Sequence, residues 1–518
     1  MSQQLPAYVK ALLQPSIYPH KPASVELVQT QMSFVFIAGE YTYKTKKPVN
    51  LGFLDYTTLD LRKKFCLKEI ELNRRLCPEV YLDVVPITQL PEGFKLGDCR
   101  NVIEYAVKMK TLARQRMMNV LLQLDQVTPD MLQMIALKLA NFHAQANTGP
   151  DINSFGSLET IKTNTDENFS QTEKYIDTII PNHVYHSIRN WTDRFMLENR
   201  GVFNQRVIAG KIRDCHGDLH TAHICFADDL YIYDCIEFND RFRYCDTVSE
   251  IAFLAMDIDR YGRADLGRYF VKAYIEASND QGLTQLLDFY KCYRAYVRGK
   301  VACFKYDDPL LPDKPALRDE ARLYFSLAYK YITNKPFLII VTGLIGTGKT
   351  TAAAKIGHAL DCVVLSSDVI RKKLAGVPLH RRQYDNFNQG LYTPEITHQT
   401  YKALLDAAKE QLSAGKSVVL DASFKKRTDR LAAMNLAKDT GAGFLAVECL
   451  ANEEVIKRRL EYRQQQGSVS DGRWEIFNDI KKDFEPVDEL NEINHIVLDT
   501  ANTSGNINAL ILERLTLL

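Results

Sequence analysis

GLIGTGKT, residues 343–350, is the stretch that decides the fold of the C-terminal part of this chain. It follows an apolar run, Phe337 to Val341, and precedes a helical pattern, which is the strand–loop–helix context of a phosphate-binding loop. Glycines let backbone N–H groups turn inward around a phosphate, and the start of the helix adds positive potential. We therefore expect Lys349 to reach the β- and γ-phosphates of a nucleotide and the Thr350 hydroxyl to bind Mg²⁺. The other candidate nucleotide contacts in this loop are Gly343, Gly346, Thr347, Gly348 and Thr351.

Around this loop, short apolar runs alternate with helical segments. Further strand-like runs are CVVLS at 362–366, SVVLDAS at 417–423 and FLAVECL at 444–450. This alternation predicts an α/β domain with a doubly wound parallel sheet. A charged amphipathic helix precedes Asn334-Lys335-Pro336, which we take as the boundary between two domains, 1–335 and 336–518.

Two acidic residues of the C-terminal domain follow predicted strands, Asp368 and Asp421. Ligands of such sheets bind at the carboxyl ends of the strands, so both side chains would face a bound phosphate. Asp368 could accept the proton of an attacking hydroxyl, and Asp421 could hold Mg²⁺ or its water. A helix-capping role for Asp368 and a strand-end turn at Asp421 are the alternatives.

Three arginines are candidates for stabilising the charge of a transferred phosphoryl group. Arg371 lies one helical turn after Asp368, and Arg459 and Arg463 lie four residues apart on one face of a predicted helix. The alternative is that these arginines are simply solvated. The polar segment between Gln466 and Phe484 is a candidate lid.

The C-terminal segment resembles the P-loop kinases that phosphorylate hydroxyls of small molecules or nucleic acids, among them gluconate-kinase, zeta-toxin and polynucleotide-kinase relatives. The resemblance covers about residues 336–500 and is carried by GLIGTGKTT, SDVIRKKL, VVLDASFKKRTDR and RRLEYR. It implies that Asp368, in a D-x-x-R motif, is the general base. It also implies that Arg459 and Arg463 are lid arginines.

The N-terminal part carries a second ordered set of polar residues. Two strands are predicted, Ser33 to Ala38 and Tyr41 to Lys47, and Lys44 lies on the second. Glu69 lies on the following predicted helix, Leu59 to Leu76. Asp218 lies in a loop, CHGDLH at 215–220, and Asp234 ends the strand predicted one hairpin later, Leu230 to Asp234. This order allows a lysine–glutamate pair for phosphates, a base and a metal ligand. Solvated lysine and glutamate side chains and a capped turn at Asp218 are the alternatives.

This set resembles the aminoglycoside-phosphotransferase-like kinases, which have a bilobal α+β fold like that of protein kinases. The resemblance covers about residues 25–330 and is carried by TYKTKKPVNLGFLDYTTLDLR, KEIELNRRL, VIEYAVKM, CHGDLH and YIYDCIEFNDRFRYCD. It implies that Lys44 is the ATP lysine, with Lys46 as its rival, and that Glu69 is its partner. It further implies that Asp218 is the catalytic base and Asp234 a metal ligand. The segment from Glu104 to Met109, with Ala106, would be the hinge beside adenine.

One departure from that family concerns a metal ligand. The family has HGDLHxxN, but residues 216–224 read HGDLHTAHI, so His223 stands in place of the asparagine. Imidazole is a poor ligand for Mg²⁺, which prefers oxygen. Three outcomes stay open, namely a weakened second metal site, an altered metal preference, or a domain that binds nucleotide without efficient transfer.

Composition limits the partners of the chain. It has 518 residues with a formal net charge of +1, and this balance disfavours a dedicated nucleic-acid binder. No apolar run approaches a membrane span, and 11 cysteines without a secretory signal predict reduced thiols in a cytoplasmic protein.

Together these features predict a two-domain kinase, α+β followed by α/β, that uses ATP and Mg²⁺ on a hydroxyl of a small molecule such as a sugar. The first alternative is an N-terminal pseudokinase that senses nucleotide and regulates the P-loop domain. The second is a kinase acting on nucleic acids or nucleotide sugars. Composition and motifs leave the acceptor open.

Overall fold

The computed structural model describes residues 5–309, 311, 313–333, 336–360, 362–378, 389–465, 473–501, 510, 511, 514 and 515. Its contacts divide the chain into two compact units. Unit 1 comprises Met1–Thr165, Phe195–Ile258 and Leu266–Tyr290, and unit 2 comprises Asp166–Arg194, Asp259–Asp265 and Lys291–Leu518. The domain boundary at residue 335 stays a prediction.

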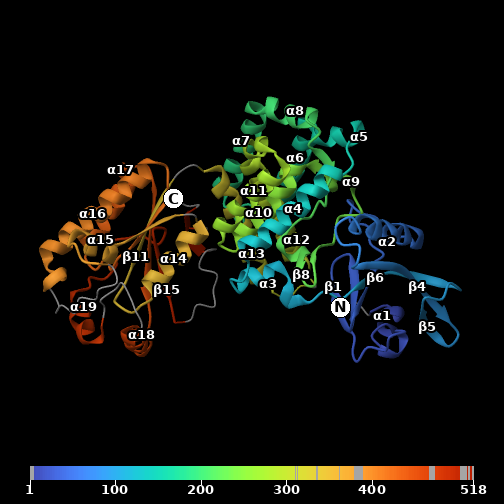
Figure 1. Cartoon of the computed structure of the whole chain (residues 1–518), viewed down its shortest axis with the longest axis horizontal. Coiled ribbons are helices and arrows are strands. Elements are labelled where there is room, and N and C mark those ends of the chain that lie inside the picture. Colours follow the sequence, from blue (N-terminus) through green and yellow to red (C-terminus); the bar gives the residue numbers. More distant parts are fainter. Residues whose placement is uncertain are drawn as a thin grey trace. The chain divides into compact units, whose positions relative to one another are not determined.

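Unit 1 is built on an antiparallel sheet of six strands in the order β1-β2-β3-β6-β4-β5. The strands are β1 (Glu26–Gln29), β2 (Ser33–Ala38), β3 (Tyr41–Lys46), β4 (Tyr81–Leu90), β5 (Gly93–Leu96) and β6 (Val102–Lys110). Helix α2 (Leu59–Asn73) packs on β4 and β6 (Figure 1). Phe34, Phe36 and Ala38 of β2 and Tyr43 of β3 are buried in one apolar core, because alternate residues of a strand point to the same face of its sheet. The strands predicted at 33–38 and 41–47 and the helix predicted from Leu59 are confirmed.

Two small antiparallel pairs carry the polar loop of unit 1. Strand β7 (Ile212–Asp214) pairs with β10 (Tyr244–Asp246), and β8 (Ile224–Phe226) pairs with β9 (Leu230–Ile232). The CHGDLH loop runs between β7 and a 3₁₀ turn, Thr221–His223. Strand β9 ends before Asp234, although the sequence predicts that Asp234 is its last residue. The reason is that Asp234 adopts a left-handed φ of 65° and donates its N–H to the Tyr81 hydroxyl, 3.2 Å away.

Helices make up most of the chain between β6 and β11. Helix α4 begins where the sequence predicts, since the Thr128 hydroxyl accepts a hydrogen bond from the N–H of Met131 and Pro129 occupies the first turn. The helices of this stretch, with α1, are α1 (Ala7–Ala11), α3 (Met118–Gln123), α4 (Pro129–Gln145), α5 (Pro150–Asn153), α6 (Leu158–Thr172), α7 (Asn182–Glu198), α8 (Arg200–Ile208), α9 (Asp240–Arg243), α10 (Thr247–Arg260), α11 (Ala264–Ser278), α12 (Leu287–Asp307) and α13 (Lys314–Ile332).

Unit 2 contains a parallel sheet of five strands in the order β12-β13-β11-β14-β15. The strands are β11 (Phe337–Thr342), β12 (Val363–Ser366), β13 (Val418–Asp421), β14 (Gly443–Leu450) and β15 (His495–Asp499). The helices that follow β11 are α14 (Lys349–Leu360), α15 (Ser367–Leu374), α16 (Pro394–Ser413), α17 (Arg427–Asp439), α18 (Glu453–Gln465) and α19 (Phe477–Asp483).

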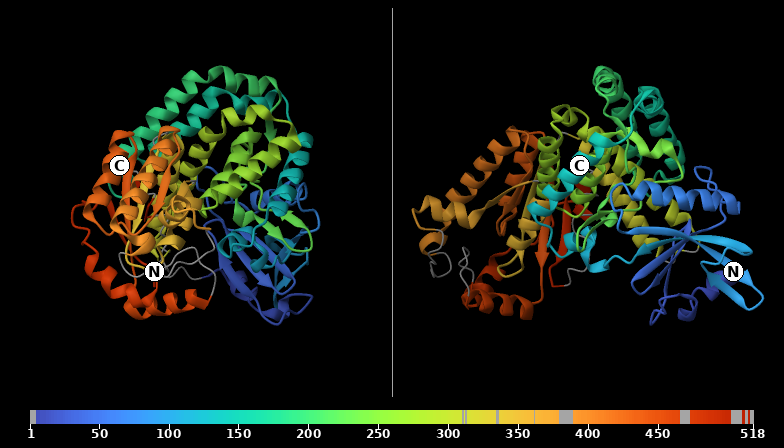
Figure 2. Two further views of the ribbon diagram at one scale, coloured as in Figure 1. Left: turned by 60° about the vertical axis from the view of Figure 1, so that its left-hand side comes forward. Right: turned by 45° about the vertical axis from the view of Figure 1, so that its right-hand side comes forward.

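Alternate residues of β11 face opposite layers of unit 2. Leu338 and Ile340 pack with side chains of α16 and α17, whereas Ile339 and Val341 pack with those of α14. Figures 1 and 2 show α16 and α17 on one face of the sheet and α14 on the other. A sheet covered on both faces explains the uninterrupted apolar run of β11. The predicted fold class, α+β followed by α/β with a parallel sheet, is confirmed.

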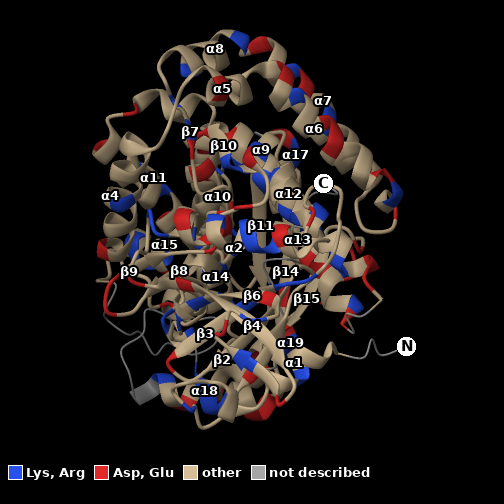
Figure 3. Ribbon diagram, turned by 90° about the vertical axis from the view of Figure 1, so that its right-hand side faces the viewer, with Lys and Arg blue, Asp and Glu red and all other residues tan. Residues whose placement is uncertain are grey.

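Charged residues of both signs are distributed along the whole chain. Basic and acidic residues are interspersed along the helices and strands, in keeping with the net charge of +1 (Figure 3). All 11 cysteines are free thiols, and of these only Cys99 is exposed, whereas eight are buried. Among the described residues, no helix is both long and apolar enough to cross a membrane.

Candidate nucleotide sites

The GLIGTGKT loop of unit 2 joins β11 to α14 as the sequence predicts. Gly343, Gly346 and Gly348 adopt φ angles of 135°, 76° and 89°, which side chains rarely allow. A Cβ at Gly343 would lie 2.5 Å from the carbonyl oxygen of Cys449, so β14 backs the loop closely. The loop conformation therefore depends on its glycines.

Lys349 is half-buried at the start of α14. Its Nζ donates a hydrogen bond to the carbonyl oxygen of Leu344, 2.7 Å away, and so spans the loop. Burial lowers the pKa of Lys349, and the negative charges of Asp421 and Asp368 act in the opposite direction. An ammonium group in this position is suited to meet the phosphates of a nucleotide.

Two carboxylates accompany Lys349 at the carboxyl edge of the parallel sheet. Asp421 ends β13 beside Val341 of β11, and Asp368 lies in the first turn of α15, directly after β12. Burial raises the pKa of Asp421, while the neighbouring Thr350 hydroxyl and Lys349 lower it. The Thr350 hydroxyl and the Asp421 carboxylate are the oxygen donors that Mg²⁺ prefers, so these residues fit that ion.

The three arginines predicted for unit 2 lie in different surroundings. Arg371 is buried, and its guanidinium donates to the Leu391 carbonyl oxygen at 2.8 Å and to the Thr397 hydroxyl at 3.1 Å. The charge of Arg463 acts on both Lys349 and Asp421, which places this arginine near the loop.

Arg459 is connected to the loop through a residue that sequence reasoning missed, Thr500. The Arg459 guanidinium donates to the hydroxyl and the carbonyl oxygen of Thr500, both at 2.8 Å. The Thr500 hydroxyl donates in turn to the carbonyl oxygen of Thr347, 2.6 Å away. Thr500 follows β15 more than a hundred residues after the loop, and only the strand order reveals its place. The residues 466–472 of the predicted lid lie outside the described residues.

In unit 1, the predicted phosphate lysine lies between two carboxylates. Lys44 Nζ is 3.0 Å from Glu69 Oε1 and 2.6 Å from Asp234 Oδ1. Burial acts to lower the pKa of Lys44, but Asp234 and Glu69 raise it well above its usual value. The structure thus brings together three of the residues that the sequence selects in this part of the chain.

The rival lysine, Lys46, points to the same side of β3 but lies deeper. Its Nζ is 2.7 Å from Glu69 Oε2 and forms a second ion pair with Glu237. Tyr56 donates a hydrogen bond to Glu237 at 2.6 Å, which closes the cluster. Lys46 is 1% exposed, so its ammonium group is committed to this buried cluster. Sequence reasoning missed Glu237, although it follows Asp234 by only three residues.

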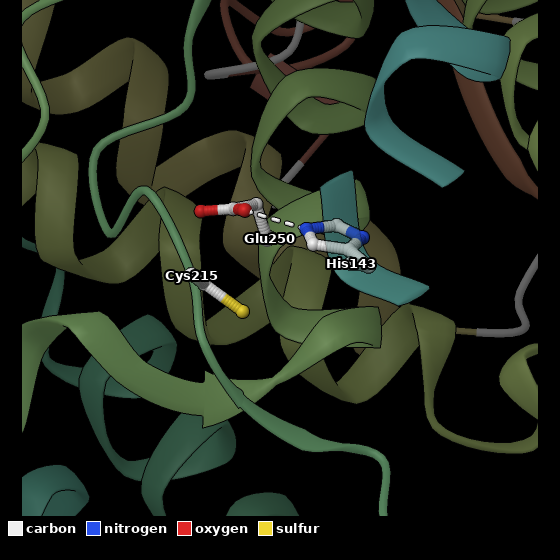
Figure 4. A group of neighbouring side chains, drawn as sticks. All are labelled: His143, Cys215 and Glu250. Carbon is white, nitrogen blue, oxygen red and sulfur yellow. Dashed lines mark hydrogen bonds and ion pairs between the residues drawn. The ribbon is translucent and has the colours of Figure 1, made fainter. Parts of the chain in front are cut away.

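A glutamate of α10, also missed from the sequence, holds the CHGDLH loop. Glu250 accepts hydrogen bonds from the backbone N–H groups of His216 and Gly217, both at 2.8 Å. His143 Nε2 lies 2.7 Å from the same carboxylate, and Cys215 lies beside the pair (Figure 4). Burial acts to raise the pKa of Glu250, but His143 and the loop N–H bring it down to about 2. This carboxylate therefore stays ionised and fixes the backbone just before Asp218.

The CHGDLH loop and the 3₁₀ turn after it bring Asp218, His220 and His223 together, and Asp234 faces them. His220 Nε2 is 3.5 Å from Asp218 Oδ2, and His223 Nε2 is 3.5 Å from Asp234 Oδ2. The aspartates offer oxygen, but the donor contributed by His223 is nitrogen. This donor set does not match the all-oxygen coordination of Mg²⁺.

The two residues of the predicted hinge segment lie inside the sheet. Glu104 is buried in β6 and forms an ion pair with Arg62 at 2.8 Å. Ala106 is buried in the same strand and pairs in register with Thr45 of β3. The Glu104 carboxylate is thus engaged in holding α2 to the sheet.

Part of the chain matches a known domain family, and most of it is similar to two mycobacterial proteins. Residues 338–487 match the model of the AAA domain family. Over 454 residues the chain is 30% identical to the uncharacterized protein Rv2004c of Mycobacterium tuberculosis, covering 87% of this chain and 88% of that protein. The uncharacterized protein Mb2027c of Mycobacterium bovis matches with the same figures.

Solved structures also match parts of the chain. A putative kinase from Chloroflexus aurantiacus aligns over 35% of this chain and 96% of its own, with 20% identity and a TM-score of 0.28. A choline/ethanolamine kinase family protein from Mesorhizobium loti aligns over 63% of this chain and 99% of its own, with 14% identity and a TM-score of 0.37. From the sequence relatives and the family match, the chain belongs to the family of these mycobacterial proteins and carries an AAA domain in its C-terminal part.

Proposed function

We propose that the chain is an ATP-dependent phosphotransferase that moves the γ-phosphoryl group to a hydroxyl of a small molecule such as a sugar. One observation carries the proposal, the meeting of Lys349, Thr350, Asp421 and Asp368 at the carboxyl edge of the parallel sheet in unit 2. A cation, two oxygen donors for a metal ion and a further carboxylate are the groups that such a transfer needs.

The proposed step in unit 2 uses these residues in separate roles. Lys349 exchanges the Leu344 carbonyl oxygen for the β- and γ-phosphates, and Thr350 and Asp421 hold Mg²⁺. When bound, this ion neutralises charge on the phosphates. The acceptor oxygen bonds to the γ-phosphorus as the bond to the β–γ bridging oxygen breaks, and ADP leaves. Asp368 takes the acceptor proton, and Arg371, Arg459 and Arg463 stabilise charge on the moving group.

Unit 1 is proposed as a second nucleotide site of the same chain. Lys44, oriented by Glu69, would bind the α- and β-phosphates, and Asp218 would accept the proton of a second acceptor hydroxyl. The backbone anchor from Glu250 supports this role of Asp218, because a general base must be held within reach of the proton that it takes.

A second candidate is that unit 1 binds nucleotide without transfer and regulates the P-loop site. The observation that favours it is His223, a nitrogen donor at the position expected to hold Mg²⁺. The near-neutral charge does not favour the third possibility, a kinase acting on nucleic acids.

An acceptor screen on the full chain tests these proposals, with ATP consumption as the readout. Lys349→Ala and Asp218→Ala, made separately and together, apportion turnover between the sites. We expect Lys349→Ala to remove most of the turnover. Unchanged turnover in the double variant would overturn the proposal, and a loss from Lys349→Ala alone would favour the regulatory role of unit 1.

A further inference from the structure

Three histidines surround the proposed base of unit 1, and their hydrogen bonds decide which ring nitrogens can bind a ligand. His216 uses both nitrogens for the backbone. Its Nε2 lies 2.9 Å from the carbonyl oxygen of Tyr233, and a carbonyl only accepts, so Nε2 carries hydrogen. Its Nδ1 accepts from the N–H of Asp218 at 3.3 Å.

His220 is oriented by the backbone in the opposite tautomer. Its Nδ1 accepts a hydrogen bond from the N–H of Ala222 at 3.3 Å, so the ring hydrogen is on Nε2. That Nε2 faces Asp218 Oδ2 at 3.5 Å. His220 is thereby set to orient the Asp218 carboxylate and not to bind a metal ion.

His223 differs from both, because its outer nitrogen is left for a ligand. Its Nδ1 lies 2.9 Å from the carbonyl oxygen of Asp218 and must carry hydrogen, which leaves Nε2 facing Asp234 Oδ2 at 3.5 Å. Histidines that bind metals usually donate their second nitrogen to a carbonyl or a carboxylate in this way. Lys44 holds the other oxygen of Asp234, which directs Oδ2 toward His223.

The spacing of the two outer atoms suits a shared ion. Two ligand atoms that each lie ~2.1 Å from one ion are themselves about 3.0 to 3.4 Å apart, depending on the geometry. Nε2 of His223 and Oδ2 of Asp234 are 3.5 Å apart. Small side-chain rotations would bring both atoms to bonding distance from one cation.

We propose that His223 Nε2 and Asp234 Oδ2 form a site for a first-row transition-metal dication, such as Co²⁺, Zn²⁺ or Mn²⁺, in preference to Mg²⁺. Imidazole nitrogen favours transition metals, whereas Mg²⁺ takes oxygen ligands and keeps its water. This metal preference adds to the function proposed for unit 1. A role of the ion in phosphate binding rests on that proposed function, whereas binding of the ion itself does not.

A Co²⁺ titration of the full chain without nucleotide tests the proposal. Visible absorption of Co²⁺ measures the affinity, and proton NMR detects the shifted, exchangeable Nδ1–H of a coordinated histidine. For the wild type we expect saturable binding at least about tenfold tighter than that of Mg²⁺, measured by competition, and one such N–H signal. His223→Asn should lose the signal and weaken Co²⁺ binding by about tenfold or more.

The matched control is His495→Asn, which alters a histidine that faces a single carboxylate, Glu448, at 3.0 Å in unit 2. It should leave Co²⁺ binding unchanged. Equal binding by wild type and His223→Asn would overturn the proposal, as would a Co²⁺-saturated wild type without the N–H signal. The N–H signal of the wild type tests the proposal by itself, so the test remains valid even if the His223→Asn chain fails to fold. No step needs turnover, so failure of the proposed kinase activity would leave this result intact.

Discussion

Lys44 and Lys46 occupy the same side of one strand and share one partner, but they face different surroundings. Both contact Glu69, yet Lys44 continues to Asp234 whereas Lys46 continues to Glu237. Lys44 keeps 17% of its side chain exposed, and Lys46 keeps 1%. A nucleotide can therefore reach the ammonium group of Lys44. The buried Lys46 holds Glu69 in place through its ion pair.

Replacing the two lysines should separate these roles. Lys46→Met leaves Glu237 without its cation and should destabilise unit 1 by about 3 to 5 kcal/mol, because a broken buried ion pair leaves an uncompensated charge. Lys44→Met should cost less stability but remove nucleotide binding by unit 1. Urea unfolding and nucleotide titration of the full chain measure the two effects. A larger stability loss from Lys44→Met than from Lys46→Met would contradict this division.

Glu250 makes the stability of unit 1 sensitive to acid. Its pKa in the folded chain is about 2, below its usual value of 4.5, so its contribution is present above about pH 4.5 and is lost as the pH falls toward 2. This difference corresponds to about 3 kcal/mol. In Glu250→Gln, unfolding free energy should fall less steeply than in the wild type over this range.

Denaturant melts between pH 5 and 2 measure this slope. Glu276→Gln is the control, because the Glu276 side chain is 59% exposed on α11 and its carboxylate lies 3.9 Å from the exposed Lys272 ammonium group. It should keep the wild-type slope. Parallel pH profiles for wild type and Glu250→Gln would show that the loop does not depend on this carboxylate.

How far the sequence predicts these residues depends on the distance between partners along the chain. Lys44, Glu69 and Asp234 follow from an ordered motif. Glu250 does not, since its partner His143 lies 107 residues away and a buried glutamate within an apolar helix has no periodic signature. Which of Lys44 and Lys46 meets Asp234 depends on the left-handed turn at Asp234, whose N–H donates a hydrogen bond to the distant Tyr81 hydroxyl.

At the scale of elements, the phosphate loop of unit 2 is held by the helix that carries the predicted lid arginines. A Cβ at Gly346 would lie 2.9 Å from Ile456 Cγ2 and 3.1 Å from Leu460 Cγ, both on α18. Arg459, on the same helix, is joined to the loop through Thr500. Position and packing of α18 are therefore coupled to the shape of the loop.

Gly346→Ala should reveal this coupling when compared with Gly415→Ala. The two glycines have φ angles of 76° and 75°, but nothing lies within 4 Å of a Cβ at Gly415. Both variants should bear the cost of a left-handed alanine, about 1 to 2 kcal/mol. Gly346→Ala should cost a further 1 to 3 kcal/mol, roughly the effect of overpacking, and should weaken nucleotide binding.

Thermal melts and calorimetric ATP titrations compare the two glycine variants. Equal stability losses would mean that α18 yields to the added methyl group and does not constrain the loop. Nucleotide affinity should remain at the wild-type level in Gly415→Ala, because that glycine lies in the turn before β13 and not in the phosphate loop.

Most elements follow from local sequence, and the exceptions lie where polar chemistry overrides it. The apolar runs predict β11 through β14, and the Thr128-Pro129 pair predicts the start of α4. The end of β9 was predicted at Asp234, two residues too far. The left-handed turn at Asp234 is supported by tertiary contacts with Lys44 and Tyr81, which no local propensity encodes.

At the scale of the whole molecule, two nucleotide sites predict two independent responses to ATP. A ligand at about 100 times its dissociation constant stabilises its site by about 2.7 kcal/mol. Hydrogen exchange of the full chain should show ATP-dependent protection of the start of α14 in unit 2 and of β3 in unit 1. Lys349→Ala should remove the first effect and Lys44→Met the second.

Each variant serves as the control for the other in this experiment. Loss of both protections from Lys349→Ala alone would contradict two separate sites and would favour one nucleotide with a secondary effect on unit 1. Exchange is suited to the question because it reports local stability segment by segment, without assuming that the chain unfolds in one step.

The distribution of thiols gives the native chain one convenient chemical handle. Burial raises the pKa of Cys66 and Cys77 to about 12, so their reactive thiolate forms are scarce, and only Cys99, between β5 and β6, is exposed among all eleven cysteines. A maleimide dye should therefore label the folded protein at one rim of the unit 1 sheet. Fluorescence from that single position could report on nucleotide binding without any cysteine having to be removed.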